Sequence, residues 1–348
     1  MELPKSFGRT PNSEEAFLYT LESEGLRVRI TDFGARIVSL EARGRSGAFE
    51  HLVLGFEHVA EYVNAGGSFG AILGRSANRI AGGRFALNGH TFALSRNEGE
   101  NTLHGGADGF SKRFWTVESA GSLALVLRLV SPDGDQGFPG ELTARATFDL
   151  HGDALTLVLE ATTTKPSPVN LSAHPYFNLG GVTALDALDH EVIIFAERFL
   201  PVDPKQIPTG ELRNVANTPF DFRRPTQVGE RIRAADPQLL IGKGYDHCFV
   251  LDEGDEGAMR MAAILRHPKN GHALEISTTQ PALQFYTGNT LNGSVAGRGG
   301  AYRQSAGLAF EPEGFPNAPN QLNFPTSILR PGQVYHKAIR YRFRCDPA

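Results

Sequence analysis

Six short segments of the chain carry polar side chains of catalytic or ligand-binding type within apolar or turn-rich sequence. His174 lies among aromatic residues, and Glu311 stands at the end of an apolar run. The segments are 74–80, 101–106, 171–179, 244–247, 280–289 and 308–312. Histidine and carboxylate side chains transfer protons, whereas arginine, amides and aromatic rings bind polar ligands. The set therefore indicates a polar ligand pocket with acid–base capability.

Together, these residue types are those of a carbohydrate pocket. Sugar hydroxyls need paired polar partners, and the apolar face of a sugar ring needs an aromatic surface. A lectin or a glycosidase would use the same types, since Asp246 with Glu311 could supply the two carboxylates that flank a glycosidic bond. Taken singly, each residue also has a purely structural explanation. Residue type alone thus leaves an enzyme and a binding protein open.

The sequence lacks the motifs that are typical of several classes of enzyme. The chain has no GxSxG, GxxxxGK[ST] or HExxH segment and no dinucleotide fingerprint. Cys248 and Cys345 form no CxxC pair, and Asp246-His247 has no third metal ligand at a useful spacing. We therefore expect neither a metal nor a cofactor.

Charge and hydropathy indicate which partners and which compartment to expect for the protein. The net charge is −4 and there is no run of five or six basic residues, so we expect neither a nucleic acid nor a membrane as partner. No apolar run reaches 18 residues, and the N-terminal segment lacks the apolar core of a secretory signal. A cytoplasmic protein is the expectation.

Alternation of apolar and more polar residues dominates the chain. It is clear over 26–31, 155–160 and 339–344, where every second residue is apolar. Successive side chains of a strand point to opposite faces, so each segment is predicted to be a strand with one apolar face.

Turns and helices fit the same picture. Asn88-Gly89 between two apolar runs predicts a hairpin, because this pair takes the positive φ angles of a type I′ turn. Helical periodicity is scarce, and 57–62 and 225–235 are expected to form a turn or two of helix. We predict mostly antiparallel β structure in two or more sheets packed face to face, without the internal repeat of a propeller.

Seven motifs resemble those of the aldose 1-epimerase (galactose mutarotase) family and occur in the family's order. They are GRSANRI (74–80), NTLHGG (101–106), DGDQGFPG (133–140), NLSAHPYFNLGG (170–181), YDH (245–247), QPALQFYTGN (280–289) and FEPEGFPNAPNQLNFP (310–325). One such motif would be a weak signal, but an ordered set across most of the chain is specific.

The resemblance implies an all-β fold in which residues 1–348 form a single domain. This would be a large galactose-mutarotase-like β-sandwich, or supersandwich, with a few short helices and an open sugar cleft on one sheet. The family's general acid falls on His174 and its general base on Glu311. Its substrate-binding positions fall on Asn78, Arg79, His104, Tyr176, Asp246 and Gln284.

The implied reaction interconverts the α and β anomers of a free aldose, such as glucose or galactose, without a cofactor. Opening of the cyclic hemiacetal removes a proton from the anomeric hydroxyl and delivers one to the ring oxygen. Glu311 as a carboxylate suits the first step, and His174 as an imidazolium suits the second. We expect their mutual attraction to keep both groups charged. The expected partner is a monosaccharide, bound by a monomer or weak homodimer.

Four positions depart from the pattern of the family. Ala173 stands where many relatives carry asparagine, and Asn317 stands where aspartate is common. Glu313 and Phe315 belong to a Glu-Gly-Phe segment in place of the more usual Gln-Asn-Trp. None of these changes removes a catalytic group, but the last three could alter the charge near Glu311 and the sugar preferred.

Two alternatives stay open at the level of sequence. A non-catalytic carbohydrate-binding module could keep the pocket without turnover, although it would need neither a matched acid nor a matched base. A phosphosugar epimerase on the same fold would need basic residues at the cleft mouth, for which Arg75, Arg223 and Arg224 are candidates.

Overall fold

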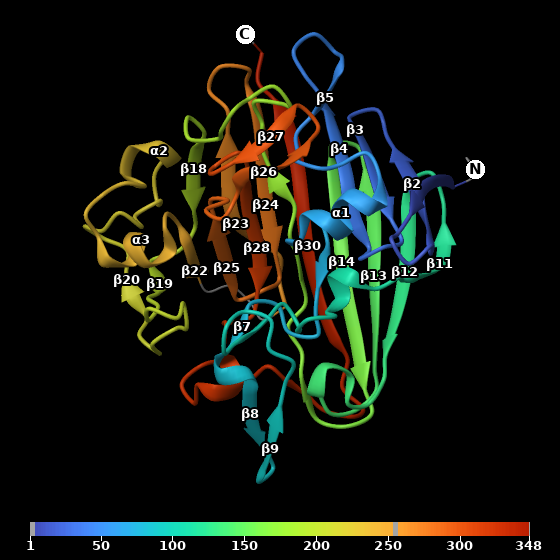
Figure 1. The fold of residues 1–348 in the computed structure, drawn as a ribbon. Coiled ribbons are helices and arrows are strands. Elements are labelled where there is room, and N and C mark those ends of the chain that lie inside the picture. Colours follow the sequence, from blue (N-terminus) through green and yellow to red (C-terminus); the bar gives the residue numbers. More distant parts are fainter. Residues whose placement is uncertain (1–3, 253–256, 348) are drawn as a thin grey trace.

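The computed structural model describes residues 4–252 and 257–347, and antiparallel strands make up most of it (Figure 1). The largest sheet has nine strands, with β14 and β30 near its middle. In spatial order they are β11 (Thr116–Ala120), β12 (Ala124–Ser131), β13 (Leu142–His151), β14 (Ala154–Thr163), β30 (Tyr335–Cys345), β24 (His272–Thr278), β23 (Arg260–Arg266), β18 (Glu191–Ile194) and β21 (Thr226–Gln227).

Two further sheets complete the main framework. The six-stranded sheet contains β17 (Tyr176–Phe177), β28 (Leu308–Glu313), β25 (Ala282–Tyr286), β22 (Asp246–Val250), β19 (Arg198–Leu200) and β20 (Arg213–Asn214). The five-stranded sheet contains β1 (Lys5–Arg9), β2 (Glu15–Glu22), β3 (Leu26–Thr31), β4 (Arg36–Arg43) and β5 (Phe49–His51).

Short elements connect these sheets and build their margins. The strand pairs are β6 (Ile72–Leu73) with β16 (Ser172–Ala173), β7 (Arg79–Ile80) with β10 (Thr102–Leu103), β8 (Arg84–Leu87) with β9 (His90–Ala93), β15 (Ser167–Pro168) with β29 (Ile328–Leu329), and β26 (Asn292–Gly297) with β27 (Gly300–Arg303). The helices are α1 (Val59–Ala65), α2 (Val228–Arg231) and α3 (Pro237–Gly242), with 3-10 turns at Ala81–Gly83, Phe110–Lys112, Asp135–Gly137 and Ala318–Asn320.

The hairpin of β13 and β14 shows how the sequence specifies the central strands. Buried and more exposed residues alternate along both strands, as period-two patterning requires. Gly152 adopts a φ of 56° in the turn between them, which glycine reaches without steric cost. Leu157 of β14 lies opposite Ile339 of β30, so the apolar faces of neighbouring strands are in register.

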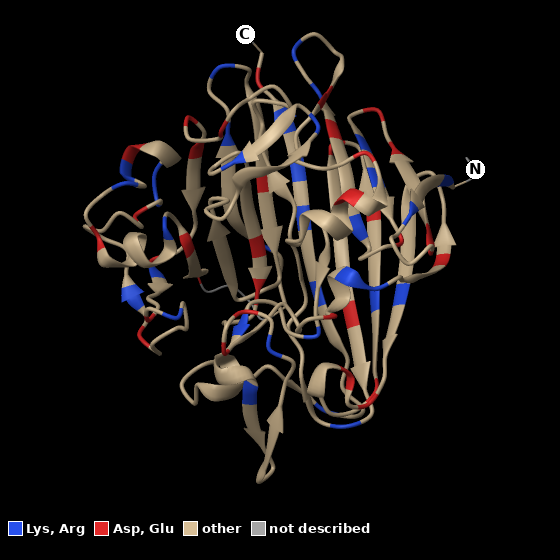
Figure 2. Ribbon diagram, in the orientation of Figure 1, with Lys and Arg blue, Asp and Glu red and all other residues tan. Residues whose placement is uncertain are grey.

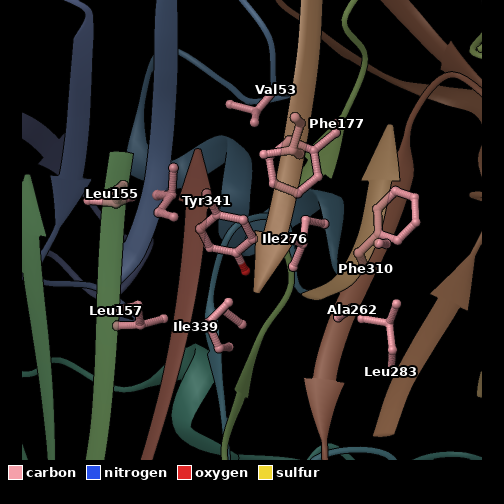
Figure 3. Packing of buried hydrophobic residues seen from close by; sticks show 14 of the residues in the cluster. Val53, Leu155, Leu157, Phe177, Ala262, Ile276, Leu283, Phe310, Ile339 and Tyr341 are labelled. Carbon is pink, nitrogen blue, oxygen red and sulfur yellow. The ribbon is translucent and has the colours of Figure 1, made fainter. Parts of the chain in front are cut away.

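The main hydrophobic core lies between the nine-stranded sheet and the two sheets packed against it. Figure 3 shows Leu157 and Ile339 of the large sheet on one side, and Leu283 and Phe310 of the six-stranded sheet on the other. The same cluster takes in Val28 and its neighbours in the five-stranded sheet. One continuous core therefore joins all three sheets and fixes the orientation of their strands.

Most of the predicted elements are confirmed. The strands expected at 26–31, 155–160 and 339–344 are β3 and parts of β14 and β30. Asn88 and Gly89 take φ angles of 51° and 78° in the turn of the β8–β9 hairpin. The short helix predicted within 57–62 runs later, at Val59–Ala65, and α3 was not predicted.

Charged side chains are spread over the outer strands and loops in both signs, but β28 carries acidic positions in the middle of the molecule (Figure 2). Among the described residues, no helix is long and apolar enough to cross a membrane.

Truncation of a central core side chain tests this packing. Leu157→Ala should lower the free energy of unfolding by about 2–5 kcal/mol, because it leaves a cavity under a fully buried position. Urea denaturation followed by circular dichroism measures the change. Val130→Ala, at a partly exposed position of β12, is the matched control and should cost about 0.5 kcal/mol. Equal losses in the two variants would contradict the assignment of the core.

Candidate active site

The strands β28, β25 and β22 lie side by side, with one face on the core and the other toward a cavity of about 310 Å³. Phe310 packs into the core, so Glu311 and Glu313 point to the opposite face of β28. Gln284 of β25 lies opposite Glu311 in the strand register. The polar face of these strands is therefore the floor of the cavity, where Glu311 is only 2% exposed.

All eight residues predicted from the sequence contribute to the wall of this one cavity. They are Asn78, Arg79, His104, His174, Tyr176, Asp246, Gln284 and Glu311. They come from distant parts of the chain, and the sheet and its connecting loops bring them together.

His174 and Glu311 are in direct contact. The Nε2 atom of His174 lies 3.4 Å from Oε1 of Glu311, and both side chains are almost completely buried. The imidazole packs against the ring of Tyr176 at 4.7 Å and meets His104 edge-on at 5.6 Å. Ala173 is fully buried in β16. Among the described residues, Nδ1 of His174 and Oε2 of Glu311 are buried without a hydrogen-bond partner.

Burial is the largest influence on the pKa values of this pair. It lowers the pKa of His174 to about 4, and it raises the pKa of Glu311 well above its usual value. Repulsion from Glu313 and Asp246 adds to the effect on Glu311, while Arg79 opposes it. The expectation that mutual attraction keeps both groups charged is therefore wrong for this structure, because the loss of hydration outweighs it. Burial favours the neutral form of both groups.

A pair of backbone contacts fixes His104. The backbone N–H of Asn78 donates to Nδ1 of His104 at 3.1 Å, and the backbone N–H of His104 donates to the Asn78 carbonyl at 3.1 Å. Nδ1 is thus an acceptor, and in the neutral ring the proton lies on Nε2. Burial and the proximity of His174 lower the pKa of His104, which favours this neutral form. His104 can therefore donate a hydrogen bond from Nε2.

Arg79 and Asp246 form the polar wall of the cavity. Arg79 is bound by Glu98 through two hydrogen bonds, of 2.7 Å from Nε and 2.8 Å from Nη2. Asp246 accepts from Nε2 of Gln284 at 2.6 Å and from Nε2 of Gln206 at 2.9 Å. Burial raises the pKa of Asp246, and the attraction of Arg79 opposes this effect.

Sequence reasoning missed several residues of the cavity wall. Glu98 and Gln206 are the most consequential, because both bind Arg79. Glu98 lies only three residues before the NTLHGG motif, which is a weak signal, whereas Gln206 has no motif around it. Tyr286 and Asn289 also line the cavity and lie within the QPALQFYTGN segment, although neither was assigned a role.

Glu313 lies beside the floor of the cavity with no exposed surface. Asn78 Nδ2 donates to its Oε1 at 2.8 Å, whereas its Oε2 has no hydrogen-bond partner among the described residues. Burial raises the pKa of Glu313 to about 8, repulsion from Asp246 acts in the same direction, and the hydrogen bond from Asn78 and the charge of Arg79 oppose it. Glu313 is thus mostly protonated at neutral pH and occupies the site of a neutral side chain.

Two other departures from the family pattern, Phe315 and Asn317, lie in the segment that follows β28. The backbone N–H of Asn317 donates to the Arg79 carbonyl at 2.9 Å, and its side-chain oxygen accepts from the Ala81 N–H at 3.0 Å. Phe315 packs edge-on against Phe324, with ring centroids 5.1 Å apart. Both residues therefore hold the loop after β28 in place.

Two groups of side chains in the described part of the chain have the spacing of metal ligands. His104, His174 and Glu311 form one, but the His104 tautomer places a proton on the nitrogen that would have to bind the ion. Asp189, His190 and His267 form the other. Its His190 Nε2 accepts from the Leu179 N–H at 2.9 Å, so in the neutral ring Nδ1 beside Asp189 carries the proton.

Three arginines were candidates to bind the phosphate group of a phosphosugar, and all three lie outside this cavity. Arg75 points away from it and donates to Ser131 and to the carbonyls of the 131–140 loop. Arg223 pairs with Asp221 and Glu197 at the surface, and Arg224 is exposed beside it.

Known proteins resemble this chain over most of its length. The family model for aldose 1-epimerase matches residues 18–342. The galactose mutarotase of Sus scrofa is 42% identical over 326 residues, 93% of each chain. The aldose 1-epimerase of Escherichia coli strain K12 is 38% identical over 337 residues, 96% of each chain.

Solved structures show the same fold. The galactose 1-epimerase from Lactobacillus acidophilus superposes with a TM-score of 0.85 at 28% identity, covering 99% of this chain and 98% of its own. An aldose epimerase homologue from C. elegans gives a TM-score of 0.86 at 27% identity, covering 95% and 99%. The predicted β-rich fold and the family resemblance are both confirmed.

The charge state of the empty site can be measured directly. In the sugar-free protein, His174 should stay neutral at neutral pH and titrate with a pKa of about 4, because burial disfavours the imidazolium. Nitrogen-15 NMR of labelled histidine follows the titration, and His174→Gln identifies the signal by removing it. A pKa at or above the ordinary 6.5 would show that attraction to Glu311 outweighs burial.

Proposed function

The chain belongs to the aldose 1-epimerase family, and we propose that His174 and Glu311 are the acid–base pair with which it exchanges the anomers of a free aldose. The protein is an aldose 1-epimerase, an isomerase that acts on sugars. Its substrate is a monosaccharide. The contact of His174 with Glu311 on the floor of the cavity is the observation that carries the assignment of the pair.

Ring opening needs a base and an acid within reach of one anomeric centre. Glu311 takes the proton of the anomeric hydroxyl while His174 delivers a proton to the ring oxygen. Rotation about the C1–C2 bond of the open aldehyde presents its other face, and the two groups exchange roles when the ring closes. Each well-placed proton transfer contributes about 10²–10⁴-fold to the rate.

One proton, which burial favours on the Glu311 carboxyl group, is sufficient for this cycle. Its transfer from Glu311 to His174, over a contact of 3.4 Å, produces the carboxylate and the imidazolium that ring opening requires. Sugar hydroxyls that donate to the carboxylate, and the nearby charge of Arg79, favour this charged form. A buried carboxylate with a raised pKa is also a stronger base than an exposed one.

The other cavity residues are suited to bind and orient the sugar. His104 offers its Nε2–H to an oxygen near the reacting end, since its ring meets that of His174. Asp246 and Gln284 present paired oxygen and nitrogen atoms to hydroxyl groups, with Arg79 alongside. Tyr176 supplies an aromatic surface. Asn78 binds Glu313 with its side-chain nitrogen and acts in this proposal mainly by holding His104.

The proposal extends to the setting of the enzyme. Residues 1–348 act as one domain, which the largest core cluster supports because its members run from Leu21 to Phe343. The cytoplasm is the proposed compartment, since Cys248 and Cys345 are both free thiols. A monomer or weak homodimer is proposed, because the exposed large apolar side chains come from separate segments of the chain.

Substitution of either member of the pair tests the mechanism. His174→Ala and Glu311→Ala should each reduce kcat/KM by about 10²-fold or more, because each removes one proton transfer. Polarimetry on freshly dissolved α-D-glucose or α-D-galactose, corrected for the uncatalysed decay, measures the rate. His151→Ala, at an exposed position of β13, is the matched control and should leave it unchanged. Unchanged rates in both site variants would contradict the assignment of His174 and Glu311 as the acid–base pair.

A substrate panel tests the preference for free sugars. Glucose and galactose should have a kcat/KM about tenfold or more above that of glucose 6-phosphate, because Glu98 already occupies one edge of Arg79 and Asp246 lies beside it. NMR of the anomeric protons measures exchange for each sugar. A higher kcat/KM for the phosphate would instead assign a phosphosugar epimerase.

A further inference from the structure

Arg79 and Asp246 face each other in the cavity without a direct hydrogen bond. Nη2 of Arg79 lies 3.7 Å from Oδ2 of Asp246. Charge-assisted hydrogen bonds between such groups are normally about 2.7–2.9 Å long. Two buried, opposite charges at this separation would gain by closing the gap, so something must hold them apart.

The side-chain amide of Gln206 lies between the two charged groups. Its Oε1 accepts from Nη2 of Arg79 at 2.9 Å, and its Nε2 donates to Oδ2 of Asp246 at 2.9 Å. The two bonds run to the same atoms that are 3.7 Å apart. Gln206 thus bridges the pair and satisfies one atom of each group.

The backbone around Gln206 directs this side chain into the cavity. Gln206 has a φ of 59°, in the left-handed region that non-glycine residues seldom occupy, and its N–H donates to the Asp203 carbonyl at 2.8 Å. The Asp203 carboxylate accepts from the N–H groups of Lys205 and Ile207 at 2.8 and 3.0 Å. Lys205 pairs with Glu100 at 2.5 Å, which ties this turn to the loop before His104.

Glu98 holds Arg79 from the other side. Its carboxylate takes Nε and one hydrogen of Nη2, and Gln206 takes a further bond from Nη2. None of these bonds uses Nη1. The guanidinium therefore has a fixed plane and keeps Nη1 outside the network.

We propose that Gln206 is a positioning residue for sugar binding, which holds Arg79 and Asp246 apart so that both remain available to sugar hydroxyls. This inference rests on the proposed function of the cavity. Without the bridge, Arg79 and Asp246 pair directly, and the hydroxyls must compete with that ion pair. The effect falls on binding, because the bonds of Gln206 reach neither His174 nor Glu311.

The bridge requires one acceptor and one donor on a side chain of this length. Gln206→Met keeps the length and removes both hydrogen bonds, and Gln206→Ala removes the side chain. Gln206→Glu keeps the acceptor for Arg79 but places a second carboxyl group against Asp246, where only its protonated form can donate. The three variants therefore separate chain length, hydrogen bonding and charge.

Steady-state polarimetry with glucose tests the proposal. Gln206→Ala and Gln206→Met should raise KM about tenfold, the equivalent of one buried hydrogen bond to a charged group, and change kcat less than about threefold. Gln206→Glu should be impaired at neutral pH and approach the wild-type KM as the pH falls, because protonation restores the donor. Gln227→Ala, at an exposed position of β21, is the matched control. Thermal midpoints check that every variant is folded.

Direct binding separates this inference from the proposed function. In the Glu311→Ala background, calorimetry should show glucose binding that weakens about tenfold when Gln206→Ala is added. That comparison needs no turnover, so it tests Gln206 even if the catalytic assignment fails. An unchanged KM and Kd in Gln206→Ala, or a fall in kcat alone, would overturn the positioning role.

Discussion

The Glu311 carboxyl group is buried against His174, and this burial sets the pKa values on which the rest of the site depends. An ionised carboxylate on the floor of this cavity loses its hydration, and its contact with a neutral imidazole does not replace it. Burial therefore favours a protonated carboxyl group beside a neutral imidazole, and hydrogen bonds from the polar groups of a ligand would lower the cost of moving the proton between them.

The strands beneath the pair carry a second buried carboxyl group, and the structure keeps it neutral. Glu313 follows Glu311 on the same face of β28, and both would repel each other strongly if ionised. The side-chain amide of Asn78 donates to Glu313, and burial raises the pKa of Glu313 to about 8, which favours its protonated form at neutral pH. At this pH it can therefore take the place of a glutamine with little electrostatic penalty, while Asn78 links it to His104.

Much of the fold and most of the site could be predicted from the sequence. Period-two alternation located β3, β14 and β30, because a strand that buries every second side chain must have apolar residues at that spacing. The same rule explains why Glu311 faces the cavity once Phe310 lies in the core. The resemblance to the family's motifs pointed to eight residues that line the cavity, because each motif could be matched position by position to this sequence. Helix α3 was not predicted, because a helix of six residues has too few turns to show helical periodicity in the sequence.

The sequence by itself determined which groups are present: an acid, a base, paired amides and carboxylates, and strands to carry them. Only the tertiary structure decided their charge states and their precise neighbours. The pKa of His174 depends on burial under residues far away in the chain, so no local pattern encodes it. Likewise, Gln206 reaches Arg79 across 127 positions of sequence through a loop that carries no motif. Hydration and hydrogen bonding depend on distances in space. Only folding determines which side chains that are distant in sequence come into contact.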